Sequence, residues 1–193
     1  MYEFITGDIV EKTPTYVILE TSNIGYLINI SLFTYTHLPG QNPCQLFMHQ
    51  IIREDAHILF GFISREEREI FRQLISVSGI GANTARLILS SLSPVEIEQA
   101  IRNGDVLLMQ SIKGIGAKSA QRIIVDLKDR ITTASDLDQL FHPQRNTMKD
   151  EALSALVNLG FTKSTVDKVL DRILGGSENL TVEELIKDAL KKL

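Results

Sequence analysis

The sequence is poor in cysteine and in long apolar runs, and each shortage excludes a class of protein. Cys44 is the only cysteine among 193 residues, so an internal disulfide is impossible and a reducing, cytoplasmic location is expected. No apolar run approaches the roughly 18 residues that a membrane-spanning helix requires. The first ten residues contain acids and no basic segment, so we expect no signal peptide and no membrane partner.

Positive charge is also in short supply, except in one segment. The formal net charge is −4, which by itself argues against a nucleic-acid ligand. By segment, the net charge is −4 for residues 1–63, +2 for residues 64–131 and −2 for residues 132–193. A DNA-binding surface is therefore expected in the central segment, with a local rather than a global positive potential.

Patterns for catalysis, metal binding and cofactor binding are missing as well. The four histidines lack metal-ligand spacing, so no metal site is expected. Residues 116–119 read Gly-Ala-Lys-Ser, which is only superficially similar to a nucleotide-binding loop. The glycine directly before the lysine and the first glycine of that loop are both absent. We therefore expect no catalytic residues, no cofactor and no ATP hydrolysis by this chain.

Residues 1–63 are typical of a small β-barrel. Segments rich in β-branched and aromatic residues alternate with turn residues, and helix signals are nearly absent. About five short strands in about 60 residues favour an OB-fold. The predicted strand segments are 16–19, 25–30, 46–52 and 57–60.

Residues 64–131 are expected to form an all-helical domain. Ser64 and Glu67 have the spacing of a capping box at a helix start. Ser93, Pro94 and Glu96 combine an N-cap, a proline at the first helical position and an acid two positions later. One apolar stripe on a long helix is formed by Ala120, Ile123, Ile124, Leu127 and Ile131.

The C-terminal third reads as a linker and a small bundle. Residues 132–147 lack clear periodicity and are interpreted as a flexible linker, with a short helical turn around 137–141 as the alternative. Residues 148–193 predict a three-helix bundle, whose last helix opens with a capping box from Thr181 to Glu184. The chain as a whole is thus expected to be an α+β multidomain protein.

An internal repeat provides the clearest functional signal. The motif Gly-Ile-Gly-Ala occurs twice, 35 residues apart, each time between helical segments. Two glycines permit a tight turn, the isoleucine between them can fill the core, and free amides at the next helix start bind an anion such as phosphate. The predicted phosphate-binding residues are Gly79, Ile80, Gly81 and Ala82 in the first copy and Gly114, Ile115, Gly116 and Ala117 in the second.

Three basic side chains follow the two copies. Lys118 and Arg122 lie one turn apart after the second, and Arg86 follows the first. They are predicted to add charge to the phosphate sites, where contacts would read the DNA backbone and not the base sequence. Each is equally well explained as part of a solvated helix face.

The repeat resembles the tandem helix–hairpin–helix domain of DNA repair and recombination proteins. The wider chain resembles the RuvA family, the Holliday-junction-binding subunits of bacterial branch-migration complexes. Beyond the repeat, the likeness rests on the segments 53–56 (Arg-Glu-Asp-Ala), 59–62 (Leu-Phe-Gly-Phe), 122–130 and 158–161 (Asn-Leu-Gly-Phe). The first hairpin often reads Gly-Val-Gly-Pro-Lys in this family, whereas Ala82 and Asn83 stand here, so one positive charge is missing.

The resemblance implies an OB-fold domain, a double helix–hairpin–helix domain and a UBA-like three-helix module. Four chains would form a tetramer, or eight an octamer, that holds a four-way junction open and flat in the bacterial cytoplasm. The module within Met148–Leu193 would bind the RuvB motor ATPase, and the resolvase RuvC is a further possible partner. Glu54 and Asp55 would form an acidic pin at the junction centre, where carboxylates repel continuous duplex. From the residues alone, a solvated acidic turn is the simpler interpretation.

Two other functions stay open. The same hairpins would serve a repair nuclease or glycosylase, for which Asp126 and Asp129 are the nearest acids, although both alternate with basic residues along a helix. A protein-interaction adaptor, with the C-terminal bundle as its active part, is the third interpretation.

Overall fold

The structure is a computed structural model that describes residues 2–40, 42–140, 148–175 and 180–193, with side chains omitted for 129–140. It divides into two compact units, Met1–Thr132 and Thr133–Leu193. Among the described residues, no helix has both the length and the apolarity to cross a membrane. The finer division into segments 1–63, 64–131, 132–147 and 148–193 stays a prediction.

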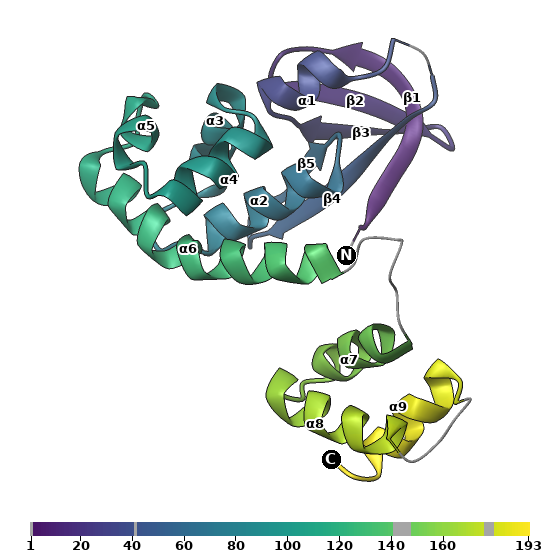
Figure 1. Ribbon diagram of the computed structural model, residues 1–193. Coiled ribbons are helices and arrows are strands. Elements are labelled where there is room, and N and C mark those ends of the chain that lie inside the picture. The colour runs from purple at the N-terminus through teal and green to yellow at the C-terminus, as the bar shows by residue number, and fades with distance from the viewer. Residues whose placement is uncertain (1, 41, 141–147, 176–179) are drawn as a thin grey trace. The chain divides into compact units, whose positions relative to one another are not determined.

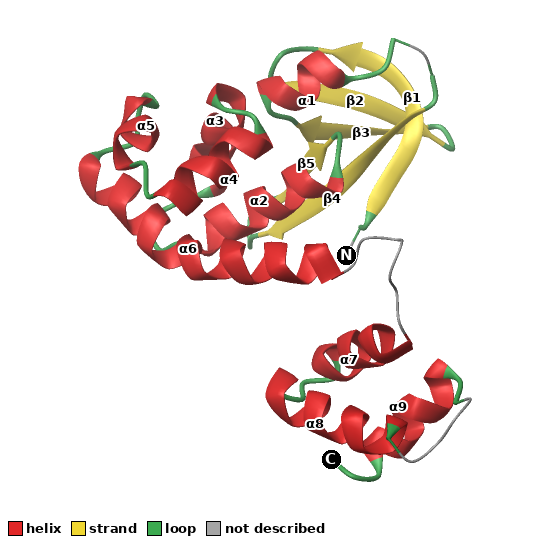
Figure 2. Cartoon of the chain, in the orientation of Figure 1, coloured by secondary structure: helices red, strands yellow, loops and turns green. Residues whose placement is uncertain are grey.

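Five strands form a closed barrel at the start of the first unit (Figures 1 and 2). They are β1 (Phe4–Lys12), β2 (Tyr16–Thr21), β3 (Ile24–Asn29), β4 (Cys44–Ile52) and β5 (His57–Phe62), ordered β1-β2-β3-β5-β4. Pairing is antiparallel except between β3 and β5, which is parallel. A short helix, α1 (Leu32–His37), connects β3 to β4. The predicted OB-fold is confirmed.

Two elements of the barrel region were not predicted. The strand β1 buries only Ile5 and Gly7 on its inner face, so its sequence lacks the apolar alternation of its neighbours. The helix α1 lies in a region where helix signals in the sequence are nearly absent. It is six residues long, too short for an apolar period, and is nucleated by Ser31, whose hydroxyl accepts a hydrogen bond from the Thr34 amide at 2.9 Å.

The helices of the first unit share a hydrophobic core with the barrel. They are α2 (Arg65–Ser76), α3 (Ala82–Ser91), α4 (Pro94–Asn103), α5 (Val106–Ser111) and the start of α6 (Ala117–Leu140). The rings of Phe60 and Phe62 from β5 lie 5.1 and 4.9 Å from the ring of Phe71 in α2. Figure 1 shows α2 beside β4 and β5, and α3 beside α1. The barrel therefore rests on α2 through aromatic packing.

The helix start predicted at Ser93 is confirmed and forms a full capping box with Glu96, but the capping box predicted at 64–67 is only half formed. The Ser64 hydroxyl accepts from the Glu67 amide at 3.1 Å, as expected. The fully buried Glu67 carboxylate, however, accepts hydrogen bonds from the hydroxyls of Ser31 and Thr34 and from the Ile63 amide. This side chain thus joins α2 to the barrel instead of closing its own helix end.

Helix α6 is longer than predicted. It continues to Leu140, so residues 132–140 are helical, where the sequence predicted a flexible linker with a short helical turn around 137–141 as the alternative. The remaining residues of that linker, 141–147, lie outside the described residues. The predicted apolar stripe is confirmed at Ala120, Ile123, Ile124 and Leu127, all of which are buried, and the Ile131 side chain is not described.

The second unit contains the predicted bundle of three helices, α7 (Met148–Asn158), α8 (Lys163–Leu174) and α9 (Val182–Leu190). The capping box at Thr181 and Glu184 is confirmed. Seven residues form the buried centre: Ala152, Leu156, Val166, Leu170, Ile173, Leu185 and Ala189. The Lys149 ammonium joins α7 to α8 through ion pairs with Asp167 at 2.8 Å and Asp171 at 2.6 Å.

Candidate nucleic-acid interface

The two glycine repeats form bends with the same backbone geometry. Gly79 has φ of +91° and Gly114 has φ of +90°. Both values lie in the left-handed region, which residues other than glycine rarely adopt. In each bend the amide of the following isoleucine, Ile80 or Ile115, donates to a carbonyl three residues earlier at 3.0 Å. The sequence repeat is therefore also a structural repeat.

The isoleucines of both bends anchor them in the same core. Ile80 and Ile115 are buried, as are Val77 and Ile112 before them. Because the anchor is apolar and lies beneath the bend, the glycines on either side of it remain exposed. This matches the predicted role of isoleucine as a plug below the hairpin.

The second glycine of each bend has no structural reason to be glycine. Gly81 is the N-cap of α3 with φ of −86°, which any residue adopts, and Gly116 directly precedes α6. A Cβ atom added to either residue would meet no heavy atom within 4 Å. The missing side chains instead leave the helix starts open to an approaching ligand.

The helix starts behind these glycines present free amides. In α3 the first amide bonded within the helix is that of Ala85, which donates to the Gly81 carbonyl at 2.9 Å, and Ala120 donates to Gly116 at 2.9 Å in α6. The amides of 82–84 and 117–119 precede these bonds and have no acceptor within their own helices. Together with the helix dipole, such amides favour an anion.

Basic residues flank the second bend in the sequence, and their side chains are exposed. Lys118 and Arg122 are exposed on α6, and the Arg122 guanidinium lies 3.9 Å from the Asp126 carboxylate. Lys113, directly before Gly114, is also exposed. Sequence reasoning did not single out Lys113, although its position in the motif marks it. Their roles as phosphate ligands stay predictions.

The first bend faces the barrel. A cavity of about 410 Å³ is bounded on one side by Gly81, Ala82 and Asn83 and on the other by barrel residues that include Asn29 and Arg53. Arg53 is exposed and forms no ion pair among the described residues. The positive charge of Arg53 therefore lies across the cavity from the first bend, where Asn83 stands in place of a lysine. Sequence spacing did not reveal this arrangement.

Arg86 contacts the barrel. Its guanidinium Nη1 donates to the Thr15 carbonyl at 3.1 Å and to Asn29 Oδ1 at 3.0 Å, both on the barrel. Burial lowers the pKa of Arg86. Its predicted contact with phosphate is not tested by this arrangement, but the side chain has an intramolecular role.

Glu54 and Asp55 cap the β4–β5 hairpin, as predicted. The Arg53 amide donates to the Ala56 carbonyl at 2.8 Å and closes the turn between the two strands. Both carboxylates are exposed, and neither forms a hydrogen bond or ion pair with another described residue. They are therefore available to repel or accept a ligand.

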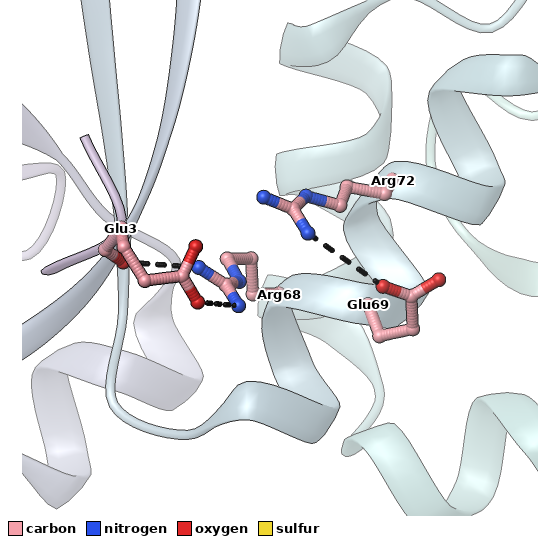
Figure 3. Close-up of polar contacts among 4 residues, drawn as sticks. All are labelled: Glu3, Arg68, Glu69 and Arg72. Carbon is pink, nitrogen blue, oxygen red and sulfur yellow. Dashed lines mark hydrogen bonds and ion pairs between the residues drawn. The ribbon is translucent and has the colours of Figure 1, made fainter. Parts of the chain in front are cut away.

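Two arginines of α2 are engaged within the protein (Figure 3). Arg68 donates to the Glu3 carbonyl at 2.9 Å and forms an ion pair with the Glu3 carboxylate at 2.6 Å, which lowers the pKa of Glu3. Arg72 lies 3.9 Å from the Glu69 carboxylate. The Arg68 contacts hold the start of the first strand against α2 and leave Arg68 unavailable to DNA, whereas the Arg72 contact lies within α2.

The part of the chain that the structure describes contains no cluster of three or more histidine, cysteine, aspartate or glutamate residues that could hold a metal ion. Cys44 is buried in the barrel, and this burial raises the pKa of its thiol. The thiol is thus disfavoured as a thiolate nucleophile.

Comparison with known proteins decides the family. Three family models match the chain: the RuvA N-terminal domain over residues 1–61, a SAM-like helix–hairpin–helix tandem over 71–129, and the RuvA C-terminal domain over 147–193. The chain belongs to the RuvA family. Two curated relatives, from Christiangramia forsetii and Flavobacterium psychrophilum, are 50% and 52% identical over 193 residues and cover 100% of both chains. A third, from Bacteroides thetaiotaomicron, is 43% identical over 201 residues.

Each of these RuvA relatives is described as a Holliday junction branch migration complex subunit. The matched helix–hairpin–helix tandem contains both glycine bends of this chain. The two RuvA-specific models cover the barrel and the three-helix bundle. The family resemblance inferred from the sequence motifs is therefore confirmed along the chain.

Proposed function

We propose that this RuvA-family chain binds four-way DNA junctions and acts as the non-catalytic DNA-binding subunit of a branch-migration complex. The observation that carries this proposal is the pair of equivalent bends, whose free amides and exposed glycines suit two phosphate groups. Lys113, Lys118 and Arg122 supply charge at the second bend, and Arg53 supplies it at the first. Such contacts recognise backbone geometry and not base sequence.

The acidic turn supplies selectivity in this proposal. Glu54 and Asp55 project from the same compact unit as the two bends and have no partner among the described residues. Carboxylates close to continuous duplex raise the free energy of binding it, whereas diverging strands at a junction leave room for them. Four chains, or eight, acting together would present one such turn each to the junction.

The C-terminal bundle is the proposed contact with the motor, RuvB, within Met148–Leu193. It has its own core and the family's C-terminal domain matches it. Exposed apolar side chains on it, Val157, Leu159 and Leu190, suit a protein partner better than DNA. The bacterial cytoplasm is the proposed location.

Binding assays at controlled salt test the proposal. The full chain should bind a four-way junction more tightly than linear duplex of equal length, and the affinity should fall steeply as salt rises because phosphate contacts release counterions. Equal affinity for the two DNAs across the salt series would rule out junction selectivity.

A further inference from the structure

Arg86 connects α3 to two strands of the barrel through a chain of hydrogen bonds. Its Nη1 donates to Asn29 Oδ1 at 3.0 Å, and Asn29 Nδ2 in turn donates to the Leu59 carbonyl at 3.2 Å. The same Nη1 donates to the Thr15 carbonyl at 3.1 Å. The first glycine bend lies one helical turn before Arg86, and the acidic turn lies just before the strand that contains Leu59.

A second polar contact lies one turn further along α3. The Ser90 hydroxyl donates to the Arg86 carbonyl at 2.7 Å and accepts from the Leu32 amide, at the start of α1 between two barrel strands, at 3.0 Å. Arg86 and Ser90 are four residues apart and so share one face of the helix. The barrel is thus held to α3 by hydrogen bonds at two successive turns.

Cavities lie on both sides of the Arg86 contact. One, of about 410 Å³, is bounded by the first bend and Arg53, and the other, of about 420 Å³, is bounded by Pro14, Leu32 and Leu87. Asn83 borders both. Packing against α3 is therefore incomplete here, in contrast to the aromatic contact between the barrel and α2. The hydrogen bonds of Arg86 and Ser90 are therefore the specific polar contacts that hold this side of the barrel to α3.

We propose that Arg86 is a positioning residue that holds the first glycine bend at a fixed distance from the acidic turn, and that it thereby sets the preference for junctions over duplex. The proposal rests on the proposed function. Aromatic packing on α2 fixes one edge of the barrel, and the Arg86–Asn29 contact fixes the other against rotation. The acidic turn then meets DNA at a constant place relative to the phosphates bound by the bends.

Charge-preserving and charge-neutral variants distinguish this role from direct phosphate binding. Arg86→Lys keeps the positive charge but loses the guanidinium geometry that spans Thr15 and Asn29. Asn29→Ala removes the contact without altering any charge. If Arg86 positions the bend, both variants should weaken junction binding about tenfold, an effect of about 1.4 kcal/mol, and affect duplex less. The double variant should be no worse than either single one.

The salt dependence of DNA affinity is the second measurement. Lys118→Gln is the positive control, and Arg102→Lys, on the exposed face of α4, is the matched negative control. The slope of log affinity against log salt should stay constant in the Asn29 and Arg86 variants. If Arg86 were instead a phosphate ligand, Arg86→Gln would lower the magnitude of this slope by about 0.9. The proposal is overturned if Asn29→Ala binds normally while Arg86→Gln lowers the slope.

A double-mutant cycle on unfolding separates failure of this proposal from failure of the proposed function. Arg86 and Asn29 should show coupling in their effects on the free energy of unfolding, whatever DNA the protein binds. Absence of junction preference in the unaltered chain would refute the proposed function. Coupling with unchanged junction preference in both variants would refute the positioning role alone.

Discussion

Serine at positions 81 and 116 should separate stability from DNA binding. Neither glycine needs its conformational freedom, and a Cβ atom meets no heavy atom within 4 Å at either position. At other helix starts in this protein a serine hydroxyl accepts from the third helical amide, at 3.1 Å in α2 and 3.3 Å in α4. A serine at 81 or 116 should do the same to the amide of Thr84 or Ser119.

The expected effects on stability and on DNA affinity have opposite signs. Serine is a better N-cap than glycine by a few tenths of a kcal/mol. Replacing glycine at an unstrained position adds about 0.4–1 kcal/mol through the unfolded chain, so each substitution should stabilise by up to about 1 kcal/mol. Binding to DNA should weaken, because the serine hydroxyl accepts the hydrogen bond of an amide that would otherwise bind phosphate, and also fills the space of the phosphate. A lost hydrogen bond to a charged group costs about 1.5–3 kcal/mol, or at least about tenfold in affinity for each bend.

Chemical unfolding and junction titration at one salt concentration measure the two effects. Gly79→Ala and Gly114→Ala serve as the comparison. Both positions have positive φ, so each of these variants should be less stable by about 1–2 kcal/mol. The reasoning is refuted if the double serine variant is folded and binds a four-way junction as tightly as the unaltered chain.

Three further predictions concern the acidic turn, the C-terminal unit and pH. Replacing Glu54 by Gln together with Asp55 by Asn should tighten binding to linear duplex, measured at matched salt; unchanged duplex affinity would exclude repulsion. Ending the chain after Leu140 should leave junction binding intact and abolish stimulation of the motor, and loss of junction binding would count against separate roles for the two units. Burial, with two nearby arginines, lowers the pKa of His49 below its ordinary value of 6.5. The unfolded chain therefore binds this proton first, so the stability contributed by neutral His49 is complete above pH 6.5 and declines on acidification. Unfolding titrations from pH 7 to 5 should show a weaker pH dependence for His49→Gln, and identical profiles would contradict the assignment.

Local signals predicted most of the fold. Four of the barrel strands, the helix starts at Ser93 and Thr181, and the apolar stripe of α6 have side-chain patterns that agree with their surroundings, so sequence periodicity was sufficient. The short helix α1 was missed because six residues are too few for an apolar period, and the strand β1 because it lacks apolar alternation. The Glu67 carboxylate departed from its predicted cap because its partners, Ser31 and Thr34, are more than 30 residues away.

The parts of the candidate site that lie close together in the sequence were predictable. The bends repeat within a few residues, so their glycines, isoleucines and free amides followed from the motif. The environment of Arg86 did not, because Thr15 and Asn29 lie on other elements and no spacing along α3 indicates them. Arg53 was overlooked as a cation beside the first bend for the same reason, since only the closed barrel brings it near Gly81.

Amide signals of the two bends test the central claim most directly. Titrating a four-way junction into isotope-labelled protein should shift or protect the amides of residues 81–84 and 116–119 in step with binding. Amides within α7, α8 and α9 provide the internal reference and should change little. Saturated junction binding that leaves both sets of bend amides unchanged would contradict the account.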